Sequence, residues 1–405
     1  MTTAPWRAVL GFGVVSLSAD MVYEGARSVT GPLLGSLGAT ALVVGLVTGA
    51  GEAVALVLRL FSGSLADRSG RYWTLTLVGY ALTAVCVPLL ALTPFLGAAG
   101  LVVASALILA ERTGKAIRSP AKSALLARAA SEVGLGRGLG VHKALDQVGA
   151  FAGPLVVAGV TALTGILWPS LAVLVVPGAV AMVLLVVVRR RMGDGGTERP
   201  PVAQPTAEAL TKAERDRLPT PFWLFAASAG AATAGLVTFG VISFHLTRDA
   251  VVAVAVVPVV YAGAMAAGAV AALATGWLYE RWAGHILLVL PFLVAAVPLL
   301  AFSDRVIPAV LGVLVWGAAV GVQDSTVKAL VASLVPAARR ATAYGAFAAV
   351  QGGAAVAGGG VAGWLYARSL PALVLVVAAT QLVALALLVV TLRRQSRDRE
   401  PVLAP

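Results

Sequence analysis

The charged residues inside the first apolar stretch are those best suited to chemistry. Asp20, Glu24 and Arg27 stand in a segment made mostly of Ala, Val, Leu and Gly. An α-helix turns 100° per residue, so these three side chains fall within roughly 60° of arc on one face. A carboxylate on such a face can carry a proton or pair with a base. Glu52 and Asp146 lie inside later apolar stretches in the same way.

These residues belong to a chain too apolar for a water-soluble domain. Of its 405 residues, 59% are hydrophobic and 12% are charged, whereas soluble domains carry about 25% charged residues. The long apolar runs suit helices that cross about 30 Å of hydrocarbon, and they lack the alternation of barrel strands. The sequence predicts an all-α membrane protein with twelve transmembrane helices, at 7–28, 39–62, 73–93, 96–117, 138–163, 166–188, 221–245, 253–278, 286–303, 307–332, 342–366 and 370–392.

The longest polar break divides these helices into two groups of six. It is charged and rich in Pro and Gly, as a solvated linker would be. The segment GSLADRSGR at 63–71 has a looser counterpart, GWLYERWAGH, at 276–285 in the second half. Parallel repeats of this kind are typical of transporters with a site between the repeats. We therefore expect two pseudo-symmetric six-helix bundles at 1–188 and 221–392, a cytoplasmic linker at 189–220, and a cytoplasmic tail at 393–405.

The distribution of charge predicts topology rather than a nucleic-acid partner. The net charge is +12, but Lys and Arg concentrate in the breaks on one side of the expected membrane, which places both termini in the cytoplasm. The first apolar run has no cleavage site and reads as a retained span. Abundant Arg, Ala, Val and Gly suit a GC-rich bacterium, and hence its cytoplasmic membrane.

Few residues could hold a metal or cofactor. Cys86 is the single cysteine, and the three histidines are far apart in sequence. The glycine-rich stretches follow no strand and match no phosphate-binding loop, so we expect neither a cofactor nor an enzyme. Nothing in the sequence indicates an oligomer, and a monomer is expected.

One loop motif connects the chain to a known family. GSLADRSGR resembles the motif G-x-L-a-D-r-x-G-r-r between the second and third helices of the major facilitator superfamily. Arg112 stands where the arginine of the family's R-x-x-Q-G motif would, although Lys115 and Ala116 replace Gln and Gly. The resemblance implies a cytoplasmic gate in which Asp67 contacts the start of the eleventh helix and Arg112 is a partner of Asp67. The implied gate residues are Gly63, Asp67, Arg68, Gly70, Arg71 and Arg112.

A second motif resembles that of the family's drug:proton antiporters, G-x8-G-x3-G-P-x2-G-G. Val157 and Ala158 replace its last two glycines. Glycines at four-residue spacing also let another helix approach closely, and for the glycines we favour this packing role. The matching residues are Gly140, Gly149, Gly153 and Pro154.

Ionised residues near the bilayer centre cost at least about 2.5–3.5 kcal/mol, so they face the bundle interior. Asp20 lies about 20 Å along its helix from Arg7 and is the first candidate for a proton carrier, followed by Glu52 and then Asp146. Glu24 and Arg27 are also candidates for the central cavity, where we interpret them as a salt bridge. A row formed by Glu111, Lys115, Arg118 and Lys122 is expected to reach the membrane interface. Candidates in the second half are Gln323, Asp324, Lys328 and Gln351.

The leading prediction is a secondary active transporter that exports a small organic molecule in exchange for protons, by alternating access. Asp20 and Glu52 favour a cationic or neutral amphiphile as substrate. A proton symporter or a uniporter for a nutrient stays open on the same fold. A membrane receptor or scaffold that transports nothing is the alternative of another class, although it would need neither the gate motif nor the buried carboxylates.

Overall fold

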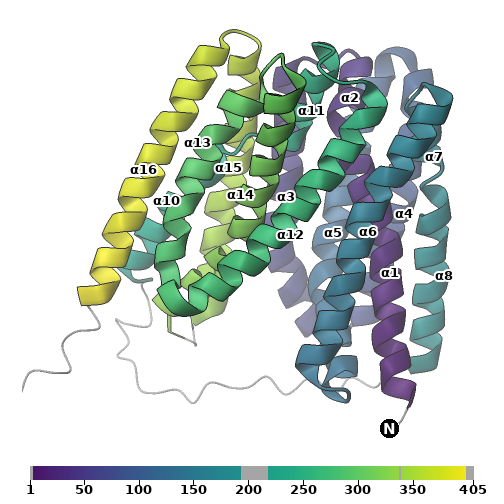
Figure 1. Ribbon diagram of the computed structural model, residues 1–405. Coiled ribbons are helices and arrows are strands. Elements are labelled where there is room, and N and C mark those ends of the chain that lie inside the picture. The colour runs from purple at the N-terminus through teal and green to yellow at the C-terminus, as the bar shows by residue number, and fades with distance from the viewer. Residues whose placement is uncertain (1–2, 193–217, 337–338, 398–405) are drawn as a thin grey trace, which may run out of the picture. The chain divides into compact units, whose positions relative to one another are not determined.

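The computed structural model describes residues 3–192, 218–336 and 339–397, and this part of the chain is helical without strands (Figure 1). Most of the predicted linker and the end of the predicted tail lie outside the described residues. The helices before the linker are α1 (Thr3–Ser28), α2 (Thr30–Ser36), α3 (Ala41–Ser69), α4 (Tyr72–Leu89), α5 (Gly100–Ser131), α6 (Leu135–Thr164), α7 (Trp168–Ala172) and α8 (Val175–Met192), with 3₁₀ turns η1 (Leu90–Phe95) and η2 (Gly97–Ala99).

The helices after the linker follow the same plan. They are α10 (Thr220–Gly235), α11 (Phe239–Arg248), α12 (Val257–Trp282), α13 (Val289–Ala301), α14 (Val306–Leu334), α15 (Arg340–Tyr366) and α16 (Leu370–Arg397), with 3₁₀ turns η3 (Val254–Val256) and η4 (Ala283–Leu288). Within the described residues, 11 stretches are long and apolar enough to cross a membrane. One of them, Val254–Ala301, has 48 residues and contains both α12 and α13. The predicted all-α protein with twelve membrane-crossing helices is confirmed.

Two of the predicted spans are broken helices. The span predicted at 166–188 comprises α7 and α8, and the span at 221–245 comprises α10 and α11. The break after α10 is an extended residue, Leu236, with φ −77° and ψ 96°. The amphipathic pattern does not reveal these breaks, because both parts of each span are apolar.

The loop motif is mostly helical rather than a loop. Gly63 to Ser69 form the last turns of α3, and only Gly70 and Arg71 lie between α3 and α4. Gly70 has φ 65°, in the left-handed region that glycine adopts at low cost. Its N–H donates to the carbonyl of Ala66 at 2.9 Å, which closes the end of α3. The motif's second glycine is therefore required by the turn into α4.

Contacts between Cα atoms divide the chain into two compact units. Unit 1 comprises Met1–Thr40, Ala50–Val202 and Ser243–Ala262, and unit 2 comprises Ala41–Gly49, Ala203–Ile242 and Gly263–Pro405. Each unit thus borrows a short segment from the opposite half of the sequence. The division into bundles at residues 188 and 221 stays a prediction.

In unit 1, α1 runs alongside α6 and α8, and α4 packs along α5 (Figure 1). Phe12 on α1 stacks on Trp73 of α4 with 5.8 Å between ring centroids. In unit 2, α10 packs on α15 and α16, and α13 packs on α14. Trp316 of α14 is fully buried and donates from Nε1 to the carbonyl of Val237 at 2.9 Å, satisfying the backbone just after the break in α10.

Candidate functional site

Two acidic residues from different helices meet inside unit 1. The carboxyl groups of Asp20 on α1 and Asp146 on α6 lie within hydrogen-bonding reach of each other. Two predicted glycines of α6 make this approach possible, because a Cβ added at Gly149 or Gly153 would press on the backbone carbonyls of Leu17 and Met21 in α1. We call Asp20 and Asp146 the carboxyl pair.

Polar side chains from three helices hold Asp146. Ser16 Oγ donates to Asp146 Oδ1 at 3.0 Å, and Lys143 Nζ donates to Oδ2 at 2.7 Å. Lys122 of α5 donates from Nζ to Ser16 Oγ at 2.9 Å, so Ser16 links a lysine to the carboxyl pair. The Lys143 side chain is 68% exposed, and it connects this buried group to the surface of unit 1.

The other predicted charges of α1 form a second group in the same unit. Arg27 Nη2 lies 2.7 Å from Glu52 Oε1 and its Nη1 lies 3.9 Å from Glu24 Oε2. The expected Glu24–Arg27 ion pair is therefore present, but the tighter partner of Arg27 is Glu52 of α3. Glu24 also accepts a 2.5 Å hydrogen bond from the hydroxyl of Tyr261, a fully buried residue of α12.

Arg112 lies with this second group rather than at the loop motif. Its guanidinium is 3.7 Å from Glu52 Oε1, 3.8 Å from Glu111 Oε2 and 4.6 Å from the centre of the Tyr23 ring. The ammonium of Lys115, one turn further along α5, lies 3.3 Å from the centre of the same ring. The expected pairing of Arg112 with Asp67 does not occur in this structure, where Asp67 accepts a 2.9 Å hydrogen bond from Tyr72.

Two members of the acidic and basic row on α5 are buried in the protein, and the position of the row relative to the membrane interface stays a prediction. Glu111 and Arg118 are buried, and both bond Thr83 of α4: Thr83 Oγ1 donates to Glu111 Oε1 at 3.2 Å, and Arg118 donates to Thr83 Oγ1. Arg118 also lies over the Tyr80 ring, 4.5 Å from its centre. The helix α5 continues to Ser131, well beyond the span predicted to end at residue 117.

The gate motif lies at the surface of unit 1. Asp67, Arg68, Gly70 and Arg71 are exposed. A Cβ at Gly63 would make only an ordinary contact with Pro120 of α5. Of the antiporter-type motif, Gly140 is exposed and Pro154 lies inside α6. These placements leave the gate itself a prediction.

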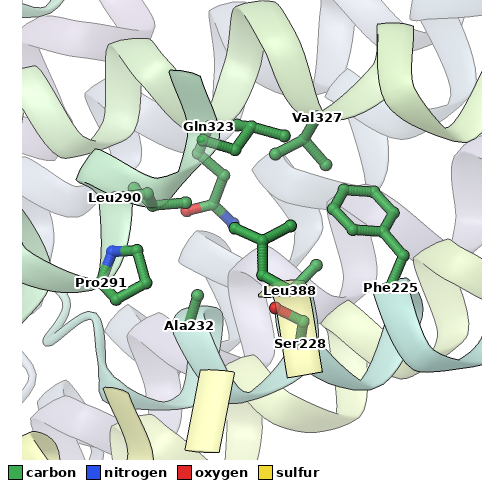
Figure 2. Close-up of a pocket in the computed structure, with 10 residues that line it drawn as sticks. Phe225, Ser228, Ala232, Leu290, Pro291, Gln323, Val327 and Leu388 are labelled. Carbon is green, nitrogen blue, oxygen red and sulfur yellow. The ribbon is translucent and has the colours of Figure 1, made fainter. Parts of the chain in front are cut away.

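The predicted amide residues of the second half converge in unit 2. Gln323 Nε2 donates to Thr233 Oγ1 at 2.7 Å, and Gln351 Nε2 lies 3.3 Å from the same oxygen. Asp324 is exposed, and the Lys328 side chain is not among the described ones. A small cavity near Gln323 is lined from α10, η4, α13, α14 and α16, with Ser228 as its second polar side chain (Figure 2). It has room for about one water molecule, so it is too small for a substrate.

Sequence reasoning missed three members of the unit 1 site, Ser16, Tyr23 and Tyr261. Ser16 and Tyr23, at i−4 and i+3 from Asp20, lie on its helix face and carried a positional signal. Tyr261 lies 237 residues from Glu24 and carried none. Within the described residues, no group of three His, Cys, Asp or Glu side chains could hold a metal ion.

Comparisons with known proteins agree with this architecture. A family model described as Major Facilitator Superfamily matches residues 12–303. An uncharacterized protein of Mycobacterium tuberculosis is 53% identical over 387 residues, covering 95% of this chain and 92% of that protein. An uncharacterized MFS-type transporter of Methanocaldococcus jannaschii is 31% identical over 142 residues, 35% of this chain and 34% of that one.

Solved structures share the fold at low sequence identity. A mutant of the nucleoside transporter NupG superposes with a TM-score of 0.74 at 14% identity, over 95% of this chain and 99% of that chain. A mutant of the peptide transporter POT gives 0.74 at 16% identity, over 96% and 94%. A bacterial homologue of the human lysosomal transporter Spinster gives 0.70 at 13% identity, over 97% and 96%. The loop motif, the twelve helices and the family match over most of the chain lead to one conclusion: this protein is a member of the major facilitator superfamily.

Proposed function

We propose that this protein is a proton-coupled secondary transporter of a small organic molecule, and that the carboxyl pair of Asp20 and Asp146 is its proton site. The observation that carries the proposal is the approach of these two carboxyl groups inside unit 1. Two ionised carboxylates at such a separation repel each other, so the pair favours one shared proton. Gain and loss of that proton changes the charge of the site by one.

The surroundings of the pair support a site that both holds and exchanges the proton. Asp146 has fixed partners in Ser16 and Lys143, whereas Asp20 faces Asp146 and the field of Lys115 and Lys122. The exposed Lys143 side chain gives the pair a connection to solvent. A charged residue this far inside a membrane helix is costly and marks a pathway or relay by default.

For the direction of transport, we propose export in exchange for protons. The support is the antiporter-type motif of α6, whose glycines press α6 against the part of α1 that bears Asp20. Alternating access between two bundles, with both termini in the cytoplasm of a bacterial cell, completes the proposal. The structural relatives include nucleoside and peptide transporters, which share the fold and leave the substrate open.

A second candidate is uptake of a molecule together with a proton. The specific observation in its favour is Lys115, which lies in reach of Asp20 electrostatically and shares the Tyr23 ring with Arg112. A proton on the carboxyl pair and a negative substrate beside Lys115 stabilise each other. The proton gradient drives the substrate out of the cell in export and into the cell in uptake.

Proton movement in energised everted membrane vesicles tests the proposal. A pH-sensitive dye reports proton efflux on addition of anionic, neutral and cationic compounds, with wild type, Asp20→Asn and Asp146→Asn. Glu132→Gln, an exposed acid just after α5, is the matched control. We expect at least one class to move protons in wild type and Glu132→Gln and in neither pair variant. Responses that persist in both pair variants, or silence in wild type, contradict the proposal.

A further inference from the structure

Two bases of α5 share one aromatic ring in the interior of unit 1. Lys115 Nζ and the Arg112 guanidinium lie 3.3 and 4.6 Å from the centre of the Tyr23 ring. Tyr23 is 3% exposed and Arg112 is 7% exposed. Gly51 of α3 leaves room for Arg112, because a Cβ there would lie 3.1 Å from Arg112 Cγ. Arg112 and Lys115 thus form a cationic surface against the Tyr23 ring, and Gly51 leaves room for the Arg112 side chain.

The donors of this surface lack acceptors in the described part of the chain. Both ion-pair contacts of Arg112 are longer than a hydrogen bond, at 3.7 and 3.8 Å, and its buried Nη1 has no hydrogen-bond partner there. Lys115 contacts the Tyr23 ring and makes no hydrogen bond within the same residues. Buried donors in native proteins nearly always have an acceptor, so the buried Arg112 Nη1 indicates a group that the site receives from outside.

The charge of the site indicates the sign of that group. The contacts described above link five acidic side chains. They also link five buried or half-buried basic side chains, not counting Lys143, which is exposed to solvent. One proton on the carboxyl pair leaves a net charge of +1 in a setting where uncompensated charge is costly. The acids are Asp20, Glu24, Glu52, Glu111 and Asp146, and the bases are Arg27, Arg112, Lys115, Arg118 and Lys122.

We infer that Arg112 and Lys115, over the ring of Tyr23, bind an anionic group of the transported molecule: a carboxylate, phosphate or sulfonate. This inference rests on the proposed transport function and names its substrate class. Arg112 lies roughly 18 Å and Lys115 roughly 22 Å from the Gly100 end of α5 at 1.5 Å per residue. That depth suits a soluble molecule that enters the protein better than a lipid headgroup at the membrane surface.

An anionic substrate differs from the expected cationic or neutral amphiphile, and its binding depends on the proton of the carboxyl pair. Glu52 already has Arg27 at 2.7 Å, and Asp20 faces both Asp146 and the field of Lys115. A proton on the carboxyl pair removes a negative charge near Lys115 and so strengthens its hold on an anion. Protonation of the carboxyl pair and binding of the anion are therefore coupled, whichever direction the transported molecule takes.

Anion binding to the purified full chain tests the site. The melting temperature of the protein is measured in nanodiscs of phosphatidylcholine. The effect of benzoate is compared with that of its neutral analogue benzamide, and the effect of sulfate with that of chloride at equal ionic strength. The variants are Lys115→Gln and Lys115→Arg, with Arg128→Gln as a control on an exposed base of the same helix. We expect benzoate or sulfate to stabilise wild type, Lys115→Arg and Arg128→Gln. Lys115→Gln should raise the half-saturating concentration about ten- to hundredfold.

Three results overturn the anion site. They are absence of anion-specific stabilisation in wild type, an unchanged half-saturating concentration in Lys115→Gln, and an equal loss in Arg128→Gln. In a further set of nanodiscs, phosphatidylglycerol replaces about 25% of the phosphatidylcholine. If that lipid abolishes the sulfate effect in wild type and changes nothing in Lys115→Gln, the anion is a lipid headgroup and the substrate assignment is wrong.

The proton site is judged separately, by Asp20→Asn in the same assay. This variant imitates a protonated pair, so at neutral pH it should bind benzoate or sulfate at least as tightly as wild type and with a weaker dependence on pH. Suppose that binding to Asp20→Asn depends on pH as binding to wild type does, and that Lys115→Gln loses binding. These results would support the anion site and contradict the proposed proton site.

Discussion

The hydroxyl of Tyr261 donates a 2.5 Å hydrogen bond to the Glu24 carboxylate, although 237 residues separate them in the chain. Tyr261 belongs to α12 in the second half of the sequence and Glu24 to α1 in the first, yet both lie in unit 1. Both residues are buried, at 0% and 9% exposure. This bond ties the charged group of α1 to a helix from the opposite half of the chain.

Tyr261→Phe should lower the free energy of unfolding by about 1–3 kcal/mol, because the buried Glu24 carboxylate loses a donor. Denaturant unfolding in detergent measures the change. A double-mutant cycle with Glu24→Gln separates the bond from general packing, since the two substitutions should be clearly non-additive. Additive effects within about 0.3 kcal/mol would mean that the hydrogen bond contributes nothing.

Glu52→Gln should destabilise the protein more than the double substitution Arg27→Gln/Glu52→Gln does. The single change removes the 2.7 Å partner of Arg27 and leaves the longer 3.9 Å contact with Glu24. Loss of the tighter partner of a half-buried charge costs about 1–2 kcal/mol once partial exposure is allowed for. The double change removes both charges. Equal losses of stability in the single and double variants, measured by the same unfolding assay, would rule out this pair as the reason.

The glycines of α6 provide a steric test of the contact with α1. Gly149→Ala and Gly153→Ala should each cost about 1–3 kcal/mol, because the added methyl groups press on the Leu17 and Met21 carbonyls. Gly159→Ala is the matched control on the same helix, where an added Cβ meets nothing within 4 Å. The melting temperature and proton movement should both decrease in the first two variants. Retention of both properties would show that α1 and α6 need not approach this closely.

The turn between α3 and α4 provides a backbone test. Gly70→Ala should cost about 1–2 kcal/mol, because alanine at φ 65° is in the left-handed region. Gly63→Ala, seven residues earlier and helical, should be neutral or stabilising, since its Cβ would make an ordinary 3.7 Å contact with Pro120. The melting temperatures of the two variants are compared. If only Gly70→Ala is lowered, the turn requires the left-handed conformation; if both are lowered, the motif is sensitive to any substitution.

Much of the architecture could be predicted because each helix is encoded locally. Apolar runs and their polar breaks fix the membrane helices, and four-residue glycine spacing marks the face of α6 that meets α1. The common face of Asp20, Glu24 and Arg27 follows from helical geometry alone. These are properties of single segments, and they need no knowledge of which helices become neighbours.

The partners of the charged residues could not be predicted, because they come from other helices. Asp20 and Asp146 are 126 residues apart, and their approach depends on the packing of α1 on α6. Arg112 was assigned to Asp67 through the family motif, whereas packing places it beside Glu52. The expectation of a cationic or neutral substrate rests on Asp20 and Glu52 alone, because the sequence does not show that bases of α5 lie near them.

Infrared difference spectroscopy tests most directly whether Asp20 and Asp146 share a proton. Wild-type protein in lipid is compared between acidic and alkaline pH for the carbonyl stretch of a protonated carboxylic acid. We predict a band in wild type that disappears in Asp20→Asn and also in Asp146→Asn, because either substitution dissolves the pair, and that persists in Glu132→Gln. A band that survives in both single variants, or none in wild type, would contradict the account.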